Sequence, residues 1–280
     1  MSWFSAEQAR RNASAIDRWT AFAGHRAQIA SLLISSAPLP PGRLCVLGAG
    51  NCNDLDLISL SRTFAELHLV DIDATSLERG VVNQGLAAAG AVFLHGGVDV
   101  TGCWERWADW AGRRAPTAAE FDDAVAGALS APPMNCGGPF DVAASTCLAS
   151  QLVESVVLAL GERHPRLAEL ILAVRTAHVR RLAQLLSPSG VGWLIVDFVS
   201  SQTLPELLAS AEPNWQELAP RLAAQGNFFH GLNPFALLQL FQRDPLLAKS
   251  VSGAEIAGFW RWNQTPKTYA VCAIKFRRQG

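Results

Sequence analysis

The sequence predicts an α/β protein with a doubly wound, mostly parallel sheet of seven strands. Short apolar segments alternate along the chain with longer segments whose apolar residues recur at helical spacing. Such alternation is typical of a parallel sheet with helices on both faces. The last two apolar segments are joined by a short turn, so they must pair antiparallel. Half of the 280 residues are hydrophobic, enough to bury a large core.

Seven segments have the composition of strands, and Pro266 and Lys267 form the turn before the last one. They cover residues 43–47, 66–71, 91–95, 140–145, 192–199, 258–262 and 269–276. Helices are expected between them, at residues 53–63, after a capping box formed by Thr75 and Glu78, and at residues 164–186.

The chain divides into an N-terminal helical cap, residues 1–40, and one α/β domain, residues 41–280. Residues 5–36 of the cap have helical spacing, and prolines follow them. Two segments, residues 102–138 and 202–251, are too long for simple connections, so we expect helical insertions at a rim of the sheet.

Composition excludes several classes of partner. The net charge of −1 gives no reason to expect a nucleic acid or an anionic membrane as partner, and no apolar run is long enough to span a bilayer. The N-terminus lacks the apolar core of a signal peptide, and six scattered cysteines without a CxxC motif fit a reducing cytoplasm without zinc or disulfides. Trp104, Trp107 and Trp110 predict a buried helical stripe, which could make a homodimer contact if left exposed.

A glycine turn and an acidic residue mark the ends of the first two strands. Gly48, Ala49 and Gly50 follow the first strand, and Asp71 ends the second, 21 positions after Gly50. Such a turn lets a cofactor approach the backbone, and a carboxylate in this position can accept hydrogen bonds from two ribose hydroxyls. This pattern serves any adenosine cofactor; the alternative is an ordinary strand–turn–helix corner with Asp71 in solvent. The NAD fingerprint needs a glycine where this chain has Asn53.

Several motifs in order carry a more specific resemblance. The segments VLGAGNCNDLDL, LHLVDID, FLHGGVDVTG and PFDVAASTCL, followed by the antiparallel pair, resemble the class I (Rossmann-like) S-adenosylmethionine (SAM)-dependent methyltransferases over about residues 40–276. The resemblance implies that Asp71 binds the ribose and that Ile72 packs on the adenine. It also implies that Asp99 receives the adenine amino group and that the N–H of Val100 meets a ring nitrogen.

The residues expected around the methionine part of SAM differ more from the family's pattern than those around the adenosine part. The resemblance places the turn at Gly48, Ala49 and Gly50 around the methionine part of SAM, with Ser145 and Thr146 beside the reactive methyl. The family's usual acid two positions before the first glycine is replaced by Val46, and its third glycine by Cys52. The amino group of SAM therefore needs Asp54 or a backbone carbonyl. Arg26, on a helix that the family often folds over the cofactor, could meet the SAM carboxylate or remain in solvent.

The resemblance implies a transferase that moves a methyl group from SAM by in-line displacement. The tip of the fourth strand lacks the Asn/Asp-Pro-Pro-aromatic motif of enzymes that methylate bases and the acid of metal-dependent catechol enzymes, which leaves a small or medium-sized, partly apolar acceptor and no metal. Asp197 and His230 are candidates for a base or substrate anchor. The alternatives are a loop hydrogen bond for Asp197 and a packed, structural role for His230.

Two other functions stay open. The departures at Val46 and Cys52 favour a non-catalytic SAM-binding or scaffold protein with the same fold. An NAD-dependent oxidoreductase is the third alternative, and binding of NAD would distinguish it.

Overall fold

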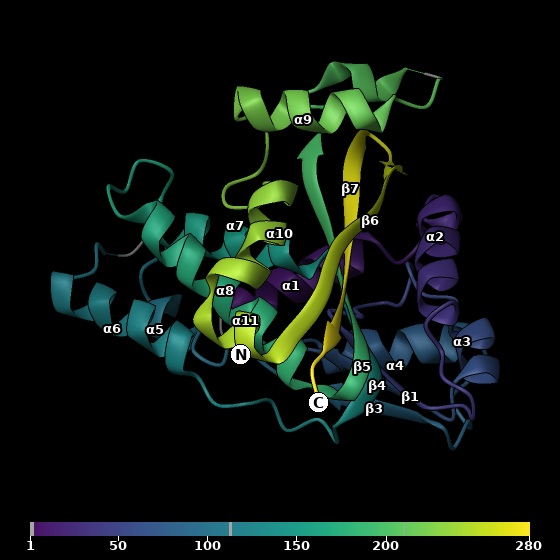
Figure 1. Ribbon diagram of the computed structural model, residues 1–280. Helices are drawn as coiled ribbons and strands as arrows, with labels where there is room; N and C mark the ends of the chain where they lie inside the picture. Colours follow the sequence, from purple (N-terminus) through teal and green to yellow (C-terminus); the bar gives the residue numbers. More distant parts are fainter. Residues whose placement is uncertain (1–2, 112–113, 210) are drawn as a thin grey trace.

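The computed structural model describes residues 3–111, 114–209 and 211–280. Residues 1–2 of the predicted cap, and residues 112–113 and 210 of the two predicted insertions, lie outside the described residues. Seven strands form one sheet in the order β3-β2-β1-β4-β5-β7-β6 (Figure 1). Strands β1 to β5 pair in parallel, and β7 is antiparallel to both β5 and β6. The predicted fold class is therefore confirmed.

Strands β1 to β4 begin within one residue of the predicted positions, but β5 and β6 begin six and seven residues earlier than predicted, and β7 begins two residues earlier. They are β1 (Arg43–Leu47), β2 (Glu66–Asp71), β3 (Val92–Gly96), β4 (Phe140–Thr146), β5 (Leu186–Ser200), β6 (Val251–Gln264) and β7 (Lys267–Arg278). Because β6 starts at Val251, the second insertion ends one residue earlier than predicted, and residues 251–257 are strand. β6 is an edge strand with many exposed side chains, so its first half lacks the apolar content that predicts a buried strand.

Helices cover both faces of the sheet (Figure 1). They are α1 (Trp3–Ser14), α2 (Ala23–Ile34), α3 (Leu57–Thr63), α4 (Ala74–Asn83), α5 (Glu105–Ala108), α6 (Ala118–Ser130), α7 (Leu148–Leu160), α8 (Leu167–Gln184), the 3₁₀ helix η1 (Pro205–Leu208), α9 (Trp215–Gln225), α10 (Pro234–Arg243) and α11 (Pro245–Ser250). Apolar residues of α2, α3 and α4 form one core with the sheet, and those of α5 to α11 form the core on the other face. Both insertions contain helices, as predicted.

The predicted single helix over residues 5–36 was wrong, because the chain turns between α1 and α2. Asn51 donates a hydrogen bond to the carbonyl of Asn12, and Asn53 donates one to the carbonyl of Ala15. Side chains of the loop after β1 therefore satisfy carbonyls at the end of α1 that a continuing helix would use. These contacts also hold α1 over the carboxyl end of the sheet.

Other helix boundaries also differ from the predictions. Asp56 accepts from the N–H of Ser59, so α3 begins at Leu57 rather than at residue 53. The cap of α4 is Asp73 rather than Thr75, because the side chain of Asp73 accepts from Ser76. α7 was not among the predicted helices.

The strand order places a crevice between β1 and β4. From β1 the chain moves outward to β2 and β3, and then returns to β4 on the other side of β1. The loops after β1 and β4 therefore lead in opposite directions, which leaves space for a ligand beyond their carboxyl ends.

Candidate functional site

The turn after β1 is held against the start of α7. Both Gly48 and Gly50 have positive φ, +78° and +46°. The N–H groups of Gly48 and Ala49 both donate to the carbonyl of Val70, at 2.9 and 3.2 Å. A Cβ on Gly48 would lie 2.9 Å from the Cβ of Leu148. Only glycine therefore fits this turn, both for its φ and for its approach to α7.

Cys52, in place of the family's third glycine, adopts a left-handed conformation with φ of +55°. The close packing of this loop on the next helix depends instead on Gly80 of α4. A Cβ there would lie 2.6 Å from the carbonyl oxygen of Asn51 and 2.9 Å from the sulfur of Cys52. The loop thus approaches a helix closely without that third glycine.

Asp71 lies at the end of β2 with its carboxylate fixed by two backbone groups. Its Oδ2 accepts from the N–H of Gly50 and its Oδ1 from the N–H of Asp73, both at 2.9 Å. The side chain is buried, and burial raises the pKa of Asp71 to about 6 although these two hydrogen bonds lower it. Each oxygen keeps a lone pair for another donor.

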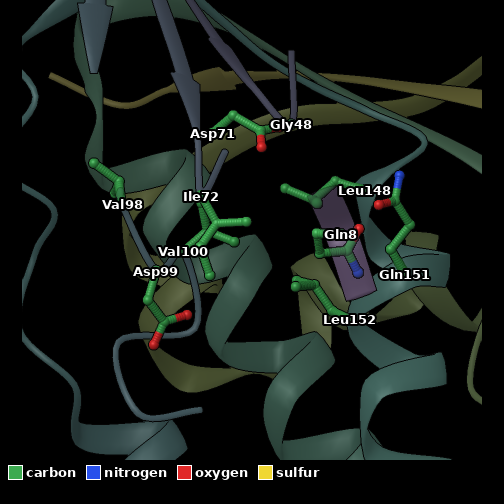
Figure 2. Close-up of a pocket in the computed structure, with 10 residues that line it drawn as sticks. All are labelled: Gln8, Gly48, Asp71, Ile72, Val98, Asp99, Val100, Leu148, Gln151 and Leu152. Atoms are coloured by element: carbon green, nitrogen blue, oxygen red, sulfur yellow. The ribbon is translucent and has the colours of Figure 1, made fainter. Parts of the chain in front are cut away.

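A narrow cavity of about 20 Å³ lies beside Asp71. Figure 2 shows its lining, which consists of Gln8, Gly48, Asp71, Ile72, Val98, Asp99, Val100, Leu148, Gln151 and Leu152. Four of the predicted adenosine-binding residues therefore meet at one place. The carboxylate of Asp99 accepts from the N–H groups of Thr101 and Trp104, at 2.8 and 3.1 Å, which fixes its orientation.

A second cavity, of about 710 Å³, continues from the same turn. Gly48 lines both cavities. Lining residues of the second cavity come from α1, the turn after β1, the ends of β4 and β5, α7, the second insertion and the β6–β7 hairpin. Predicted site residues among them are Gly48, Ala49, Gly50, Asp54, Thr146, Asp197 and His230.

Two acids in the wide cavity hold protons more strongly than ordinary aspartates. Burial raises the pKa of Asp54 to about 7, while the hydroxyl of Thr146 beside it lowers this pKa. That hydroxyl is buried and makes no hydrogen bond of normal geometry to a described residue. Burial also raises the pKa of Asp197 to about 7, and the hydroxyl of Ser150 donates to it at 2.6 Å. Both carboxyl groups therefore change protonation near neutral pH.

Aromatic side chains form a connected row on this cavity. Trp262 contacts Phe22 and Tyr269, with ring centroids 5.0 and 5.4 Å apart, and Phe229 meets Tyr269 edge-on at 6.4 Å. All four rings line the cavity. Trp262 also stacks on His25 of α2, with the ring centroids 4.3 Å apart. The wide cavity is thus partly apolar.

Three predicted site residues are placed differently from the rest. Ser145 is fully buried and its hydroxyl bonds His178 at 2.8 Å, and it lines neither cavity. Arg26 also lines neither, because it stacks on the ring of Trp19 and donates to the carbonyl of Asn53 at 2.7 Å. His230 is exposed at the edge of the wide cavity rather than packed inside the insertion.

Comparison with known proteins finds similarity in structure only. No protein-family model matches the sequence, and a search of curated proteins finds no match. Magnesium protoporphyrin IX methyltransferase (ChlM) from Synechocystis PCC 6803, solved with bound SAH, is 13% identical over 99% of each chain at a TM-score of 0.51. The 1,6-didemethyltoxoflavin-N1-methyltransferase of Burkholderia thailandensis is 13% identical over 99% of this chain and 87% of its own, at 0.49.

This chain has the fold of the class I SAM-dependent methyltransferases. Its two cavities lie where a methyltransferase fold of this order leaves its crevice, at the carboxyl ends of β1 and β4.

Among the described residues, no group of three or more His, Cys, Asp or Glu side chains is arranged to hold a metal ion. No helix in the described ranges combines the length and apolar character needed to cross a membrane. The six cysteines are buried and free. Trp107 and Trp110 are buried as predicted, so they offer no exposed dimer contact, but the predicted helical stripe was wrong, because α5 covers only Glu105–Ala108 and contains Trp107 alone of the three tryptophans.

The sequence reasoning missed the contribution of α1 and α7 to both cavities. Gln8 on α1 and Gln151 on α7 line the narrow one, and Glu154 on α7 lines the wide one. Gln8 and Asn12 lie one helical turn apart and so share a face of α1. This spacing identifies them as site residues only once α1 is known to lie over the crevice.

Proposed function

We propose that this protein is a SAM-dependent methyltransferase that transfers a methyl group to a small or medium-sized, partly apolar molecule. The observation that carries the proposal is the carboxylate of Asp71. It is buried at the end of β2 and fixed by the N–H groups of Gly50 and Asp73, with its remaining lone pairs at the narrow cavity. That arrangement suits two adjacent ribose hydroxyls.

Residues suited to each part of the cofactor line the two cavities. Asp71 would bind the ribose, Ile72 and Val100 the adenine, and the Gly48–Gly50 turn the methionine part. Asp54, beside Thr146, offers a carboxylate to the amino group of that part. When bound, SAM supplies a methyl group that is already electrophilic, so the protein's task is to place an acceptor in line and to exclude water.

The wide cavity supplies the acceptor side of this scheme. Its aromatic row of Phe22, Trp262, Tyr269 and Phe229 offers planar surfaces for an apolar part of the acceptor. Asp197 is the better placed candidate base, since it is buried in the cavity and its pKa of about 7 leaves a useful fraction ionised at neutral pH. His230, exposed at the edge, would contact the outer part of the acceptor.

Isothermal titration calorimetry with SAM, S-adenosylhomocysteine (SAH) and NAD tests the proposal. We expect binding of SAM and SAH and none of NAD. Release of SAH from SAM in the presence of an acceptor would then separate an enzyme from a non-catalytic SAM-binding protein. Absence of SAM and SAH binding, or tighter binding of NAD, would contradict the proposed function.

A further inference from the structure

Gln8 is a largely buried polar side chain that makes no hydrogen bond to a described residue. Only 7% of it is exposed. It lines the narrow cavity, and Figure 2 shows it beside Leu148 and Leu152 of α7, across the cavity from Ile72 and Val100. Its amide atoms are not among the fully enclosed polar atoms without a partner, so the amide reaches the open space of the cavity, where a ligand can take up its hydrogen bonds.

The lining of the narrow cavity is short of side-chain donors. Asp71 and Asp99 present carboxylates, and the other side chains there are apolar apart from two glutamines. The amide of Gln151 already donates to the carbonyl of Cys147, at 3.4 Å. Adenosine carries ring nitrogens and an ether oxygen that only accept hydrogen bonds. The second N–H of Gln151 and both N–H groups of Gln8 are therefore the side-chain donors that this lining can offer, and Gln8 is the one whose amide makes no hydrogen bond to a described residue.

Contacts of α1 place Gln8 at this position. Asn12 lies one turn further along the same face of α1 and donates to the carboxylate of Asp73 at 3.1 Å. Asp73 lies two residues after the end of β2. Arg11 forms an ion pair with Glu154 of α7, at 2.5 Å. α1 thus bridges the two sides of the crevice. Because the cavity measures only about 20 Å³, a purine ring requires Gln8 to change rotamer or α1 to move outward.

We propose that Gln8 of α1 hydrogen-bonds the adenosine part of the cofactor. This inference rests on the proposed function, because it takes the ligand to be SAM. It adds a cofactor-binding residue outside the strand-end loops.

Two variants test the role of the amide. Gln8→Leu removes it at similar size, and Gln8→Glu keeps an acceptor but removes the donors. We expect roughly 5- to 20-fold weaker binding of both SAH and 5′-methylthioadenosine in each variant by calorimetry, since both ligands carry the adenosine that loses a hydrogen bond. Arg10→Ala, on the same helix with a side chain 77% exposed, is the control and should bind as wild type does.

Thermal unfolding distinguishes a ligand contact from a structural role. Gln8→Leu puts an apolar side chain in place of a largely buried amide that makes no hydrogen bond to a described residue, so we expect its melting temperature without ligand to equal or exceed that of the wild type. Unchanged SAH affinity in Gln8→Leu, or affinity lost together with a lower melting temperature, would overturn the inference. Failure of the wild type to bind SAH would instead contradict the proposed function.

Discussion

The narrow and the wide cavity meet at Gly48 but are built from different parts of the chain. Most residues that line the narrow cavity, including both of its acids, lie at the ends of β1, β2 and β3 or in the loops that follow them. The wide one takes its walls from α1, the end of β5, the second insertion and the β6–β7 hairpin, segments separated by up to about 250 residues. The acidic residues of the narrow cavity therefore come from strand ends, with α1 and α7 completing its wall, whereas the wide cavity depends almost entirely on how distant segments pack.

The largest effect should follow from removing the carboxylate of the narrow cavity. In Asp71→Ala two charge-assisted hydrogen bonds to the ribose are lost, so we expect SAH affinity to fall by roughly 10²- to 10⁴-fold. Calorimetry measures it, and Glu78→Gln, an exposed acid on α4, is the control. Retained affinity in Asp71→Ala would show that the ligand binds elsewhere.

The wide cavity should respond in rate rather than in cofactor affinity. Asp197→Asn removes the candidate base while its side-chain oxygen can still accept from Ser150. With an identified acceptor, we expect kcat to fall at least roughly 100-fold at pH 7 and SAH affinity to stay within about twofold. His230→Ala, at the exposed edge, should change KM more than kcat. If Asp197→Asn keeps its full rate, the base is another group or none is needed.

The pH dependence of cofactor binding should follow the acids near the turn. The ribose hydroxyls donate to ionised Asp71, whose pKa without ligand is about 6, so binding below that pH must first remove a proton. Affinity for SAH should be constant above about pH 8, fall by up to roughly tenfold per pH unit as Asp54, with a pKa of about 7, takes up a proton, and approach roughly hundredfold per pH unit below pH 6, where Asp71 is protonated as well. Asp71→Asn should limit the slope to roughly tenfold per pH unit. Tighter wild-type binding at low pH would contradict the assignment.

The smallest expected effect concerns the packing of the turn after β1 on α7, and two glycines with similar backbone conformations test it. Gly48 and Gly85 have φ of +78° and +73°, but a Cβ at Gly85 would meet nothing within 4 Å, whereas one at Gly48 would meet Leu148. We expect Gly85→Ala to lower the free energy of unfolding by about 1 kcal/mol, from backbone strain alone. Gly48→Ala should cost about 2–4 kcal/mol and weaken SAH binding, because the clash adds to the strain. Equal losses in urea unfolding would show that the turn is not packed on α7.

The parts that could be predicted from the sequence are those encoded by short apolar strands and the residues after them. Asp71, Ile72, Asp99 and Val100 follow directly from the ends of β2 and β3, and the structure brings all four to one cavity. The first half of β6 escaped prediction because an exposed edge strand carries many polar side chains. The role of Gln8 was missed because α1 reaches the crevice only through long-range contacts with Asp73 and Glu154.

The lining of the wide cavity shows a second limit on what the sequence can predict. The pairing of β5 with β7 changes register between Asp197 and Val199, and such a bulge decides which side chain faces the cavity. Alternation along the strand cannot reveal it. The contact of Trp262 with Phe22 joins residues far apart in the sequence, so the aromatic row is visible only in the folded chain.

A crystal structure of the protein with SAH tests the account most directly. We predict SAH along the crevice between β1 and β4, with both ribose hydroxyls bonded to the carboxylate of Asp71 and the sulfur facing the wide cavity. Ligand bound outside the crevice, or a ribose that does not touch Asp71, would contradict the account.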